Sequence, residues 1–190
     1  TRARRSPGSA LKPFIYALGM DQGLVHPLTM LKDAPARFGG FNPENFDREF
    51  AGPVSVHDAL IRSRNLPAVQ VAMRLRQPSL YEFMQQARVG LPRSEDYYGL
   101  ALALGGAEVS MEELVQMYAV LANGGQWRPL RYVRNDPPPA GARLLSAETL
   151  YGIRPLELRA RVIAEGVLAG AHRSKRFGSS ADFAEHKVYT

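Results

Sequence analysis

The sequence predicts one globular domain built mainly from helices. The chain has 190 residues, of which 45% are apolar, so it can bury a sizeable core. Apolar residues recur at helical spacing in several segments, and serine or proline stands where helices should start. The longest apolar stretches, such as 100–104 and 162–171, are too short or too interrupted by charge to cross a bilayer as a helix.

The first third of the chain should contain two helices separated by a long loop. A helix is expected over residues 9–20, because apolar residues follow one another there at helical spacing. A Gly- and Pro-rich stretch then predicts irregular structure through residue 53. Ser55 can cap the next helix, whose apolar face lies at residues 56–60.

The remaining elements are mostly helical as well. Pro67 suits the first turn of one helix, and Ser79 begins another. Ser110-Met-Glu-Glu113 has the pattern of a capping box and opens a strongly periodic helix, which Asn123-Gly-Gly125 ends. The expected elements after that glycine pair are a short strand over 126–133, a helix beyond residue 146, a helix over 160–171, and a polar tail over 172–190.

Composition narrows the classes of function. The net charge of +6 comes from scattered arginines without a dense stripe interleaved with aromatic residues, so no nucleic-acid partner is expected. Attraction to an anionic polymer or a membrane surface explains the charge equally well. The chain has no cysteine, and His26 and His57 show no ligand spacing, so neither a metal nor a cofactor is expected.

Ser9-Ala-Leu-Lys12 is the first motif that could carry chemistry. It places a hydroxyl and an amine three residues apart at the start of a helix, which brings both onto one face. A lysine acts as a base when burial lowers its proton affinity, and the helix N-terminus offers N–H groups to an oxyanion developing beside Ser9. Eleven serines and four lysines predict about 0.2 such pairs by chance, so the pair alone is a weak signal.

Ser63-Arg-Asn65 is the second motif. It falls in a predicted turn between a helix that ends near Arg62 and one that opens at Pro67. A hydroxyl and a carboxamide on alternate residues of a rigid connection can point into one cleft, where Ser63 relays a proton and Asn65 holds an amide of the substrate. Alone, this pair is a weak signal, because the end of one helix followed by the beginning of the next also explains it.

Longer blocks around both motifs resemble a known family. The segments 7–14 (Pro-Gly-Ser-Ala-Leu-Lys-Pro-Phe) and 58–69 (Asp-Ala-Leu-Ile-Arg-Ser-Arg-Asn-Leu-Pro-Ala-Val) resemble the serine and Ser-x-Asn motifs of penicillin-binding proteins. The segments 102–109 and 113–125 resemble the glycine turn and the following helix of the same domain. Asn42–Asp47 and its surroundings are most similar to the bifunctional class A members of the 1C type.

The resemblance implies the penicillin-recognising α+β fold, in which a mainly helical part packs against an antiparallel sheet. It divides the chain into a partial transpeptidase domain over 1–150 and a C-terminal segment, 151–190, whose relation to the family stays open. It also implies acyl transfer on peptidoglycan stem peptides, with Ser9, Lys12, Ser63 and Asn65 as catalytic residues. β-Lactam antibiotics would be trapped at the acylation step.

The resemblance also implies a setting in the cell. The expected location is the periplasm or the outer face of the bacterial inner membrane. The chain opens on Thr1-Arg-Ala-Arg-Arg5 with no secretory signal, which favours the middle of a longer protein. That parent protein would be anchored in the membrane outside this segment, and a glycosyltransferase domain would precede Thr1.

The third motif of the family, Lys-Thr-Gly or Lys-Ser-Gly, is missing from the sequence. None of the four lysines is followed two places later by glycine. Since that strand binds the substrate carboxylate and supplies an oxyanion donor, turnover by this chain is doubtful. The unfamiliar tail suggests a truncated or frame-disrupted product, and an incomplete sheet predicts poor stability in isolation.

Three alternatives remain open at this point. A β-lactam sensor or inactive binding module would keep Ser9 and Lys12 without turnover. A β-lactamase would need a carboxylate that positions a water for deacylation, and the sequence has no matching acidic motif. The last alternative is a nonfunctional fragment.

Overall fold

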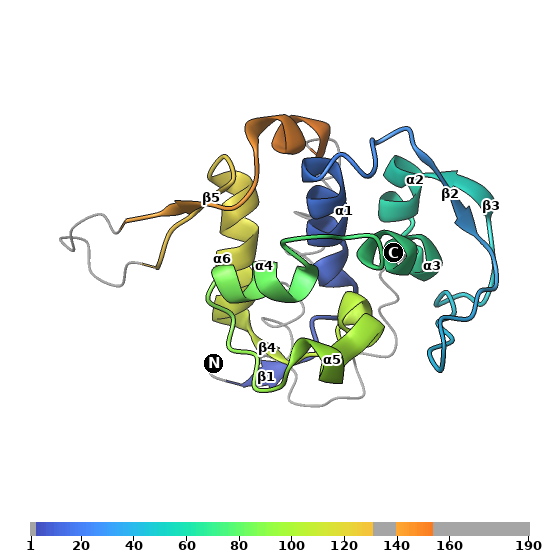
Figure 1. The fold of residues 1–190 in the computed structure, drawn as a ribbon, viewed down its shortest axis with the longest axis horizontal. Coiled ribbons are helices and arrows are strands. Elements are labelled where there is room, and N and C mark those ends of the chain that lie inside the picture. Colours follow the sequence, from blue (N-terminus) through green and yellow to red (C-terminus); the bar gives the residue numbers. More distant parts are fainter. Residues whose placement is uncertain (1–2, 131–139, 154–190) are drawn as a thin grey trace, which may run out of the picture.

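The fold is organised around one buried helix, α1 (Lys12–Asp21), which lies at the centre of the ribbon (Figure 1). The computed structural model describes residues 3–130 and 140–153 of the chain. A 3₁₀ turn, η1 (Gly8–Leu11), leads into α1, and Pro13 lies in the first helical turn, where its missing N–H has no intrahelical partner to lose. All residues from 12 to 19 are buried, so the helix predicted over 9–20 is confirmed as a core helix.

Three of the predicted helix starts, those at Ser55, Ser79 and Ser110, are confirmed. Ser55, Ser79 and Ser110 each accept a hydrogen bond from the backbone N–H three residues on, and the last two form complete capping boxes. The helices that follow α1 are α2 (Val56–Ile61), α3 (Asn65–Ala72), α4 (Leu80–Gln86), α5 (Glu95–Tyr98), the 3₁₀ segment η2 (Gly99–Leu104) and α6 (Met111–Ala122). Residues 147–153 are also helical, as predicted beyond residue 146, whereas the helix expected over 160–171 and the tail lie outside the described residues.

Two of these elements, α5 and η2, were not predicted. The four residues of α5 are too few to show helical periodicity, and Gly99, at φ +49°, separates α5 from η2. The sequence Gly-Leu-Ala-Leu-Ala-Leu of η2 carries no polar residue that would reveal a solvent-facing side. The backbone of this segment nevertheless forms a 3₁₀ helix.

The strands of the described residues form three short antiparallel pairs. The pairs are β1 (Arg4–Arg5) with β4 (Val109–Ser110), β2 (Met30–Asp33) with β3 (Gly52–Ser55), and β5 (Gln126–Trp127) with β6 (Ala142–Arg143). Together with the helices they make a mixed α and β architecture, as expected. The β1–β4 pair lies below α1 in Figure 1, the β2–β3 pair beside α2 and α3, and β5 beside α6.

The pairing of β2 with β3 corrects the prediction of irregular structure through residue 53. The alternation in β2 is only four residues long, and it places Asp33 as well as Leu31 on the buried side. A buried carboxylate and the Gly52-Pro53 pair in β3 both argue against strands when only the sequence is considered. The strand predicted over 126–133 is also shorter than expected, since residues 128–130 are not in a strand and 131–133 lie outside the described residues.

Aromatic packing joins α1 to α4 and to α6. The Phe14 ring lies 5.7 Å from that of Phe83 and 5.0 Å from that of Tyr118, the second pair edge to face. The Tyr118 hydroxyl also donates to the backbone oxygen of Ala10 at 2.9 Å. Tyr118 therefore packs against the core and ties α6 to the turn that precedes α1.

A glycine turn supports the segment that leads into η1. Gly105 ends η2 at φ +89°, and a Cβ atom added there would lie 2.3 Å from the backbone nitrogen of Gly8. Ser6 joins the same two residues, since its hydroxyl donates to the Gly105 oxygen at 2.7 Å and accepts from the Gly8 N–H. The backbone of residues 6–8 can approach this turn only because residue 105 has no side chain.

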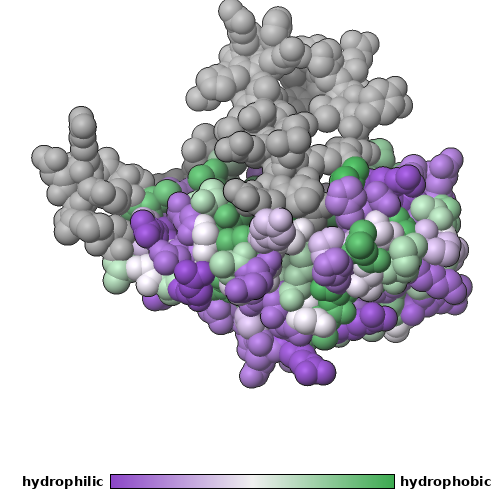
Figure 2. Space-filling view, turned by 90° about the horizontal axis from the view of Figure 1, so that it is seen from above, coloured by the Kyte–Doolittle hydropathy of each residue, from purple (hydrophilic) through white to green (hydrophobic). Residues whose placement is uncertain are grey.

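The surface carries isolated apolar side chains. Phe46, Tyr151, Leu28 and Tyr97 are the most exposed large hydrophobic residues, and they come from different segments of the chain. Figure 2 shows hydrophobic residues interspersed among hydrophilic ones on the face seen from above. Among the described residues, no helix has the length and apolar content that crossing a membrane requires.

Replacing Gly105 by alanine should unfold the chain more readily than the same change at Gly124. Both glycines end a helical segment at positive φ, but an added Cβ would clash with Gly8 at position 105 and meet nothing within 4 Å at position 124. We expect Gly124→Ala to lower the free energy of unfolding by about 1 kcal/mol and Gly105→Ala by at least about 2 kcal/mol more. Equal losses in urea unfolding would show that the Gly105–Gly8 contact does not constrain the fold.

Candidate active site

The amine of Lys12 lies in the core, where three oxygen atoms surround it. The residue is 1% exposed, although lysine is one of the residues that are almost never fully buried without a partner. Its Nζ donates to the backbone oxygen of Ser63, to the Ser63 hydroxyl at 3.0 Å and to Oδ1 of Asn65 at 2.6 Å. The structure thus brings together three of the four residues singled out from the sequence.

Ser63 makes these contacts from a strained backbone position. It lies at φ +55° directly after α2, a conformation that usually belongs to glycine. The Ser63 N–H bonds to the Leu60 oxygen and the Arg64 N–H to the Ala59 oxygen, the two bonds of a Schellman motif. The predicted turn is therefore confirmed, and at this C′ position the chain places a hydroxyl where glycine would be the least strained residue.

Asn65 is the first residue of α3, so this helix begins two residues earlier than predicted. Its Oδ1 accepts from Lys12, while its Nδ2 donates to the Glu44 oxygen at 2.6 Å. Its backbone N–H donates to Oδ1 of Asn45 at 2.7 Å. The carboxamide is therefore oriented from both ends, and one of its two amide hydrogens is left for another acceptor.

Ser9, the fourth predicted residue, lies one turn before Lys12 in η1. Its backbone oxygen accepts the Lys12 N–H, and its side chain is exposed. The structure thus places an accessible hydroxyl at the N-terminal end of α1 and a buried amine within the first turn of the same helix. The preceding residue, Gly8, is the one that contacts the glycine turn at Gly105.

The surroundings of Lys12 favour its neutral form. Burial lowers the pKa of the amine from 10.5 to about 7, with a further lowering by the positive charge of Arg64 and an opposing effect of Asp33. A neutral amine has two hydrogens and one lone pair. Its two N–H groups can satisfy the carbonyl oxygens of Ser63 and Asn65, and its lone pair can accept from the Ser63 hydroxyl.

A network of polar side chains, buried at Asp33, Asn45 and Arg64, lies behind this turn, and nothing in the sequence pattern singled it out. Arg64 donates to Asp33 at 2.7 Å, to Asp47 at 2.6 Å and to the backbone oxygen of Glu49. Asn45 donates to the other oxygen of Asp33 at 2.7 Å. Arg64 is the middle residue of the Ser63-Arg-Asn65 motif, and this position is the one feature of the sequence that could have indicated its role.

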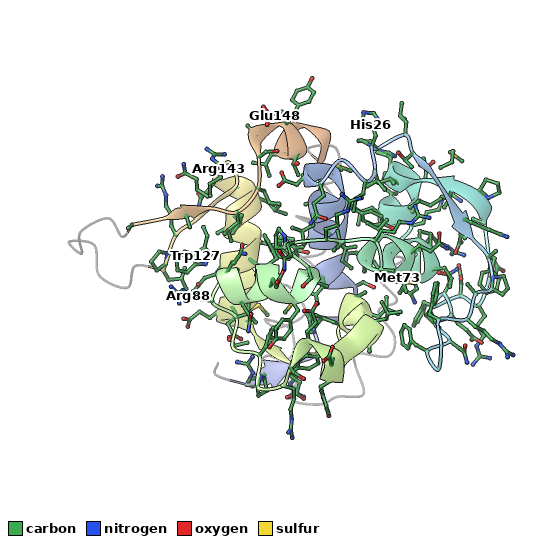
Figure 3. All side chains as sticks on the ribbon, in the orientation of Figure 1. His26, Met73, Arg88, Trp127, Arg143 and Glu148 are labelled. Carbon is green, nitrogen blue, oxygen red and sulfur yellow. The ribbon has the colours of Figure 1, made fainter. Side chains whose placement is uncertain are left out.

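The other conspicuous side chains lie away from this site. His26 and Glu148 lie at the upper edge of the molecule in Figure 3, and Trp127 lies beside α6. Glu108 is exposed. Within the part of the chain that the structure describes, no three His, Asp or Glu side chains are grouped so as to hold a metal ion.

Comparison with known sequences identifies relatives over most of the chain. Residues 1–166 match the sequence profile of the penicillin binding protein transpeptidase domain. Penicillin-binding protein 1C of Escherichia coli (strain K12) is 44% identical over 137 residues, which are 70% of this chain and 17% of that protein. Penicillin-binding protein 1A of Neisseria flavescens is 34% identical over 132 residues, or 66% and 16% of the two chains. The chain thus spans about a sixth of the length of these curated relatives.

Comparison with solved structures identifies the fold. The apo TP domain of penicillin-binding protein 3 from Burkholderia pseudomallei superposes with a TM-score of 0.67 at 22% identity, over 80% of this chain and 52% of that one. A peptidoglycan glycosyltransferase from Burkholderia ambifaria gives the same TM-score at 21% identity, over 80% and 54%. These likenesses confirm the α+β fold that the four sequence blocks led us to expect.

The lowered pKa of Lys12 should make the stability of the chain depend on pH. Between pH 7 and 10.5 the unfolded chain holds a proton on Lys12 that the folded chain has lost, so the free energy of unfolding should rise with pH in this window. We expect the rise between pH 7 and 9 to approach about 1.4 kcal/mol per pH unit. Urea unfolding of Lys12→Met, which has no titrating amine, should lack this rise, and parallel curves for the two proteins would contradict the assignment.

Proposed function

Because this chain belongs to the transpeptidase domain family of penicillin-binding proteins, we propose that it forms an acyl-enzyme on Ser9 with peptidoglycan stem peptides and with β-lactams. The observation that carries the proposal is the buried Lys12 amine, held by Ser63 and Asn65 one turn away from the accessible Ser9 hydroxyl. A base with a pKa of about 7 is suited to activating a hydroxyl at neutral pH.

In the first step the Ser63 hydroxyl turns away from the lone pair of the neutral Lys12 amine, which then takes the proton of Ser9 as Oγ attacks the carbonyl carbon. The carbonyl electron pair moves onto oxygen, and the positive dipole end at the start of η1 and α1 would stabilise the resulting oxyanion. Since Lys12 is buried, it gains this proton without competition from bulk water. The alternative of a fully charged amine would leave no base at this position.

In the second step the oxyanion collapses and the C–N bond breaks. The departing nitrogen needs a proton, and the Ser63 hydroxyl, 3.0 Å from the Lys12 amine, is suited to pass it on: it gives its own proton to the nitrogen and takes one from the Lys12 ammonium. Asn65 holds the amine from the other side through Oδ1. Its remaining amide hydrogen is available to a carbonyl oxygen of the substrate.

The proposed donor is a stem peptide ending in two D-alanines, whose last residue leaves as the free amino acid. An amine of a neighbouring strand would then attack the ester on Ser9 and release the cross-linked product. A β-lactam follows the same first step, but its departing nitrogen stays tethered to the acyl group, so the acyl-enzyme persists. No cofactor takes part in either sequence of steps.

A second candidate function is covalent binding of β-lactams without turnover. It needs only the residues of the first step, Ser9 and Lys12, which the described site contains. In the longer parent protein we propose a periplasmic location, a membrane anchor outside this segment, and an additional glycosyltransferase domain. We also retain the proposed division into a transpeptidase segment over 1–150 and a C-terminal segment over 151–190.

The chain should be labelled covalently by a fluorescent penicillin, and Ser9→Ala should abolish the label. Ser94→Ala is the matched control, since Ser94 is exposed, makes no capping hydrogen bond and lies outside the site. Its labelling should equal that of the unchanged chain. A label that survives in Ser9→Ala would rule out the proposed nucleophile. Release of D-alanine from a stem-peptide mimic would separate transpeptidation from binding without turnover.

Replacing Ser63 by glycine should stabilise the turn while it slows labelling. Glycine relieves the strain of φ +55° but removes the hydroxyl, whereas alanine removes the hydroxyl and keeps the strain. We expect Ser63→Gly to be more stable than Ser63→Ala by about 1 kcal/mol in urea unfolding. The penicillin labelling rate of both should fall by about a hundredfold. Full labelling of either variant would contradict the relay role of Ser63.

A further inference from the structure

The side chain that links the two residues of the Ser63-Arg-Asn65 motif is buried and charged. Arg64 is 8% exposed, and the Asp33 carboxylate that accepts from its Nε is 0% exposed. Burying such a pair costs several kcal/mol of desolvation for each ion, and a pair of apolar side chains would often hold a fold together as well. The stability of the core therefore does not by itself explain why charges lie here.

The Asp33 carboxylate is fully engaged. Its Oδ2 accepts from Arg64 at 2.7 Å and from the backbone N–H of Ala51 at 2.9 Å, and its Oδ1 accepts from Asn45 at 2.7 Å. These bonds join the end of β2 to the loop before β3 and to the turn between α2 and α3. Because every bond is made to a charged oxygen, the arrangement is rigid as well as specific.

Asn45 transmits this arrangement to the site. Its Nδ2 is held by Asp33 and by the Glu49 oxygen at 2.8 Å, which fixes the direction of its Oδ1. That Oδ1 accepts the backbone N–H of Asn65 at 2.7 Å. The orientation of Asn65 on the Lys12 amine is thus set by a side chain that does not itself contact the amine.

We propose that Asp33, Arg64 and Asn45 form a positioning cluster, which holds Ser63 and Asn65 on the Lys12 amine and whose two charges act on that amine with opposite sign. The proposal rests on the proposed function in so far as Lys12 is the base. The cluster residues are positioning residues, since none of them contacts a reacting atom. Asn45 lies in the loop that joins β2 to β3.

The electrostatic part of the proposal follows from the charges that face Lys12. Arg64, in the turn before α3, lowers the pKa of Lys12, whereas Asp33, at the end of β2, raises it. On α1 itself, burial and the Asp33 charge raise the pKa of Tyr16, so its hydroxyl stays neutral. The Asp58 carboxylate of α2 accepts from the Ser55 hydroxyl, and the Glu82 carboxylate of α4 accepts from the Ser79 backbone N–H, so each is engaged at the cap of its own helix.

The test measures the titration of Lys12 directly, by NMR of the chain labelled with ¹³C-lysine. The sequence has only four lysines, and the signal of Lys12 is identified by its loss in Lys12→Met. We expect Arg64→Gln to raise the titration midpoint of Lys12 by about one pH unit and Asp33→Asn to lower it by about one unit. The matched control, Asp58→Asn, should leave it unchanged, because Asp58 is a half-exposed carboxylate outside the cluster.

Opposite shifts distinguish positioning charges from a purely structural role. If the cluster only maintained packing, either variant would loosen the site and hydrate Lys12, so both midpoints would rise toward 10.5. Shifts in the same direction, or no shift, would overturn the proposal. Should Arg64→Gln fail to fold, the double variant with Asp33→Asn buries no unpaired charge, and its midpoint must lie above that of Asp33→Asn.

The outcome is independent of the proposed acylation. Penicillin labelling measured on the same samples reports the function, whereas the NMR midpoints report the cluster. Failure to label with the expected order of midpoints would reject the proposed function and keep the cluster. Labelling without the expected order of midpoints would keep the proposed function and reject the cluster.

Discussion

The constraint on which the rest of the structure depends is the burial of one lysine amine. A helix that is buried on all sides ordinarily carries only apolar residues, but α1 carries Lys12 in its first turn. An amine in this position must either lose its proton or be surrounded by acceptors. The chain does both: burial lowers the pKa of Lys12 to about 7, and Ser63 and Asn65 supply three oxygen atoms.

Supplying those oxygen atoms determines the conformation of a distant part of the chain. The Ser63 carbonyl and hydroxyl both reach the amine because the residue adopts a positive φ after α2. Such a conformation persists only where the surroundings hold it. Here Arg64 is anchored on Asp33 and Asp47, and Asn65 on Asn45, so the turn is held on both sides of Ser63. Strain, buried charge and a base of lowered proton affinity are thus parts of one arrangement.

The sequence predicted the elements whose ends carry side-chain signals. Ser55, Ser79 and Ser110 were sufficient to place three helix starts, because a capping serine acts on backbone groups within three residues of itself. The pairing of β2 with β3 could not be predicted in the same way. It depends on Asp33 being neutralised by Arg64, a partner 31 positions away, and a buried aspartate looks unfavourable for a strand until that partner is known.

The candidate site shows the same division between local and distant information. Ser9, Lys12, Ser63 and Asn65 were found from short motifs and from the flanks that make those motifs specific. Asn45 lies in the block 42–47, which marked the type of relative but gave no sign of contact with Asn65. The cluster behind the turn is made of contacts between segments, and single-sequence patterns describe only spacing within one segment.

The hydrogen bonds on Lys12 also bear on the order in which the chain folds. They join residues 51 and 53 positions apart, so closing this loop has an entropic cost that only later contacts can offset. A ribosome releases α1 well before Ser63. Until residues 63–65 arrive, burying Lys12 would leave a charge without acceptors, and so the central helix should remain hydrated during synthesis. The residue that is suited to catalysis would thereby delay collapse of the core until its partners are present.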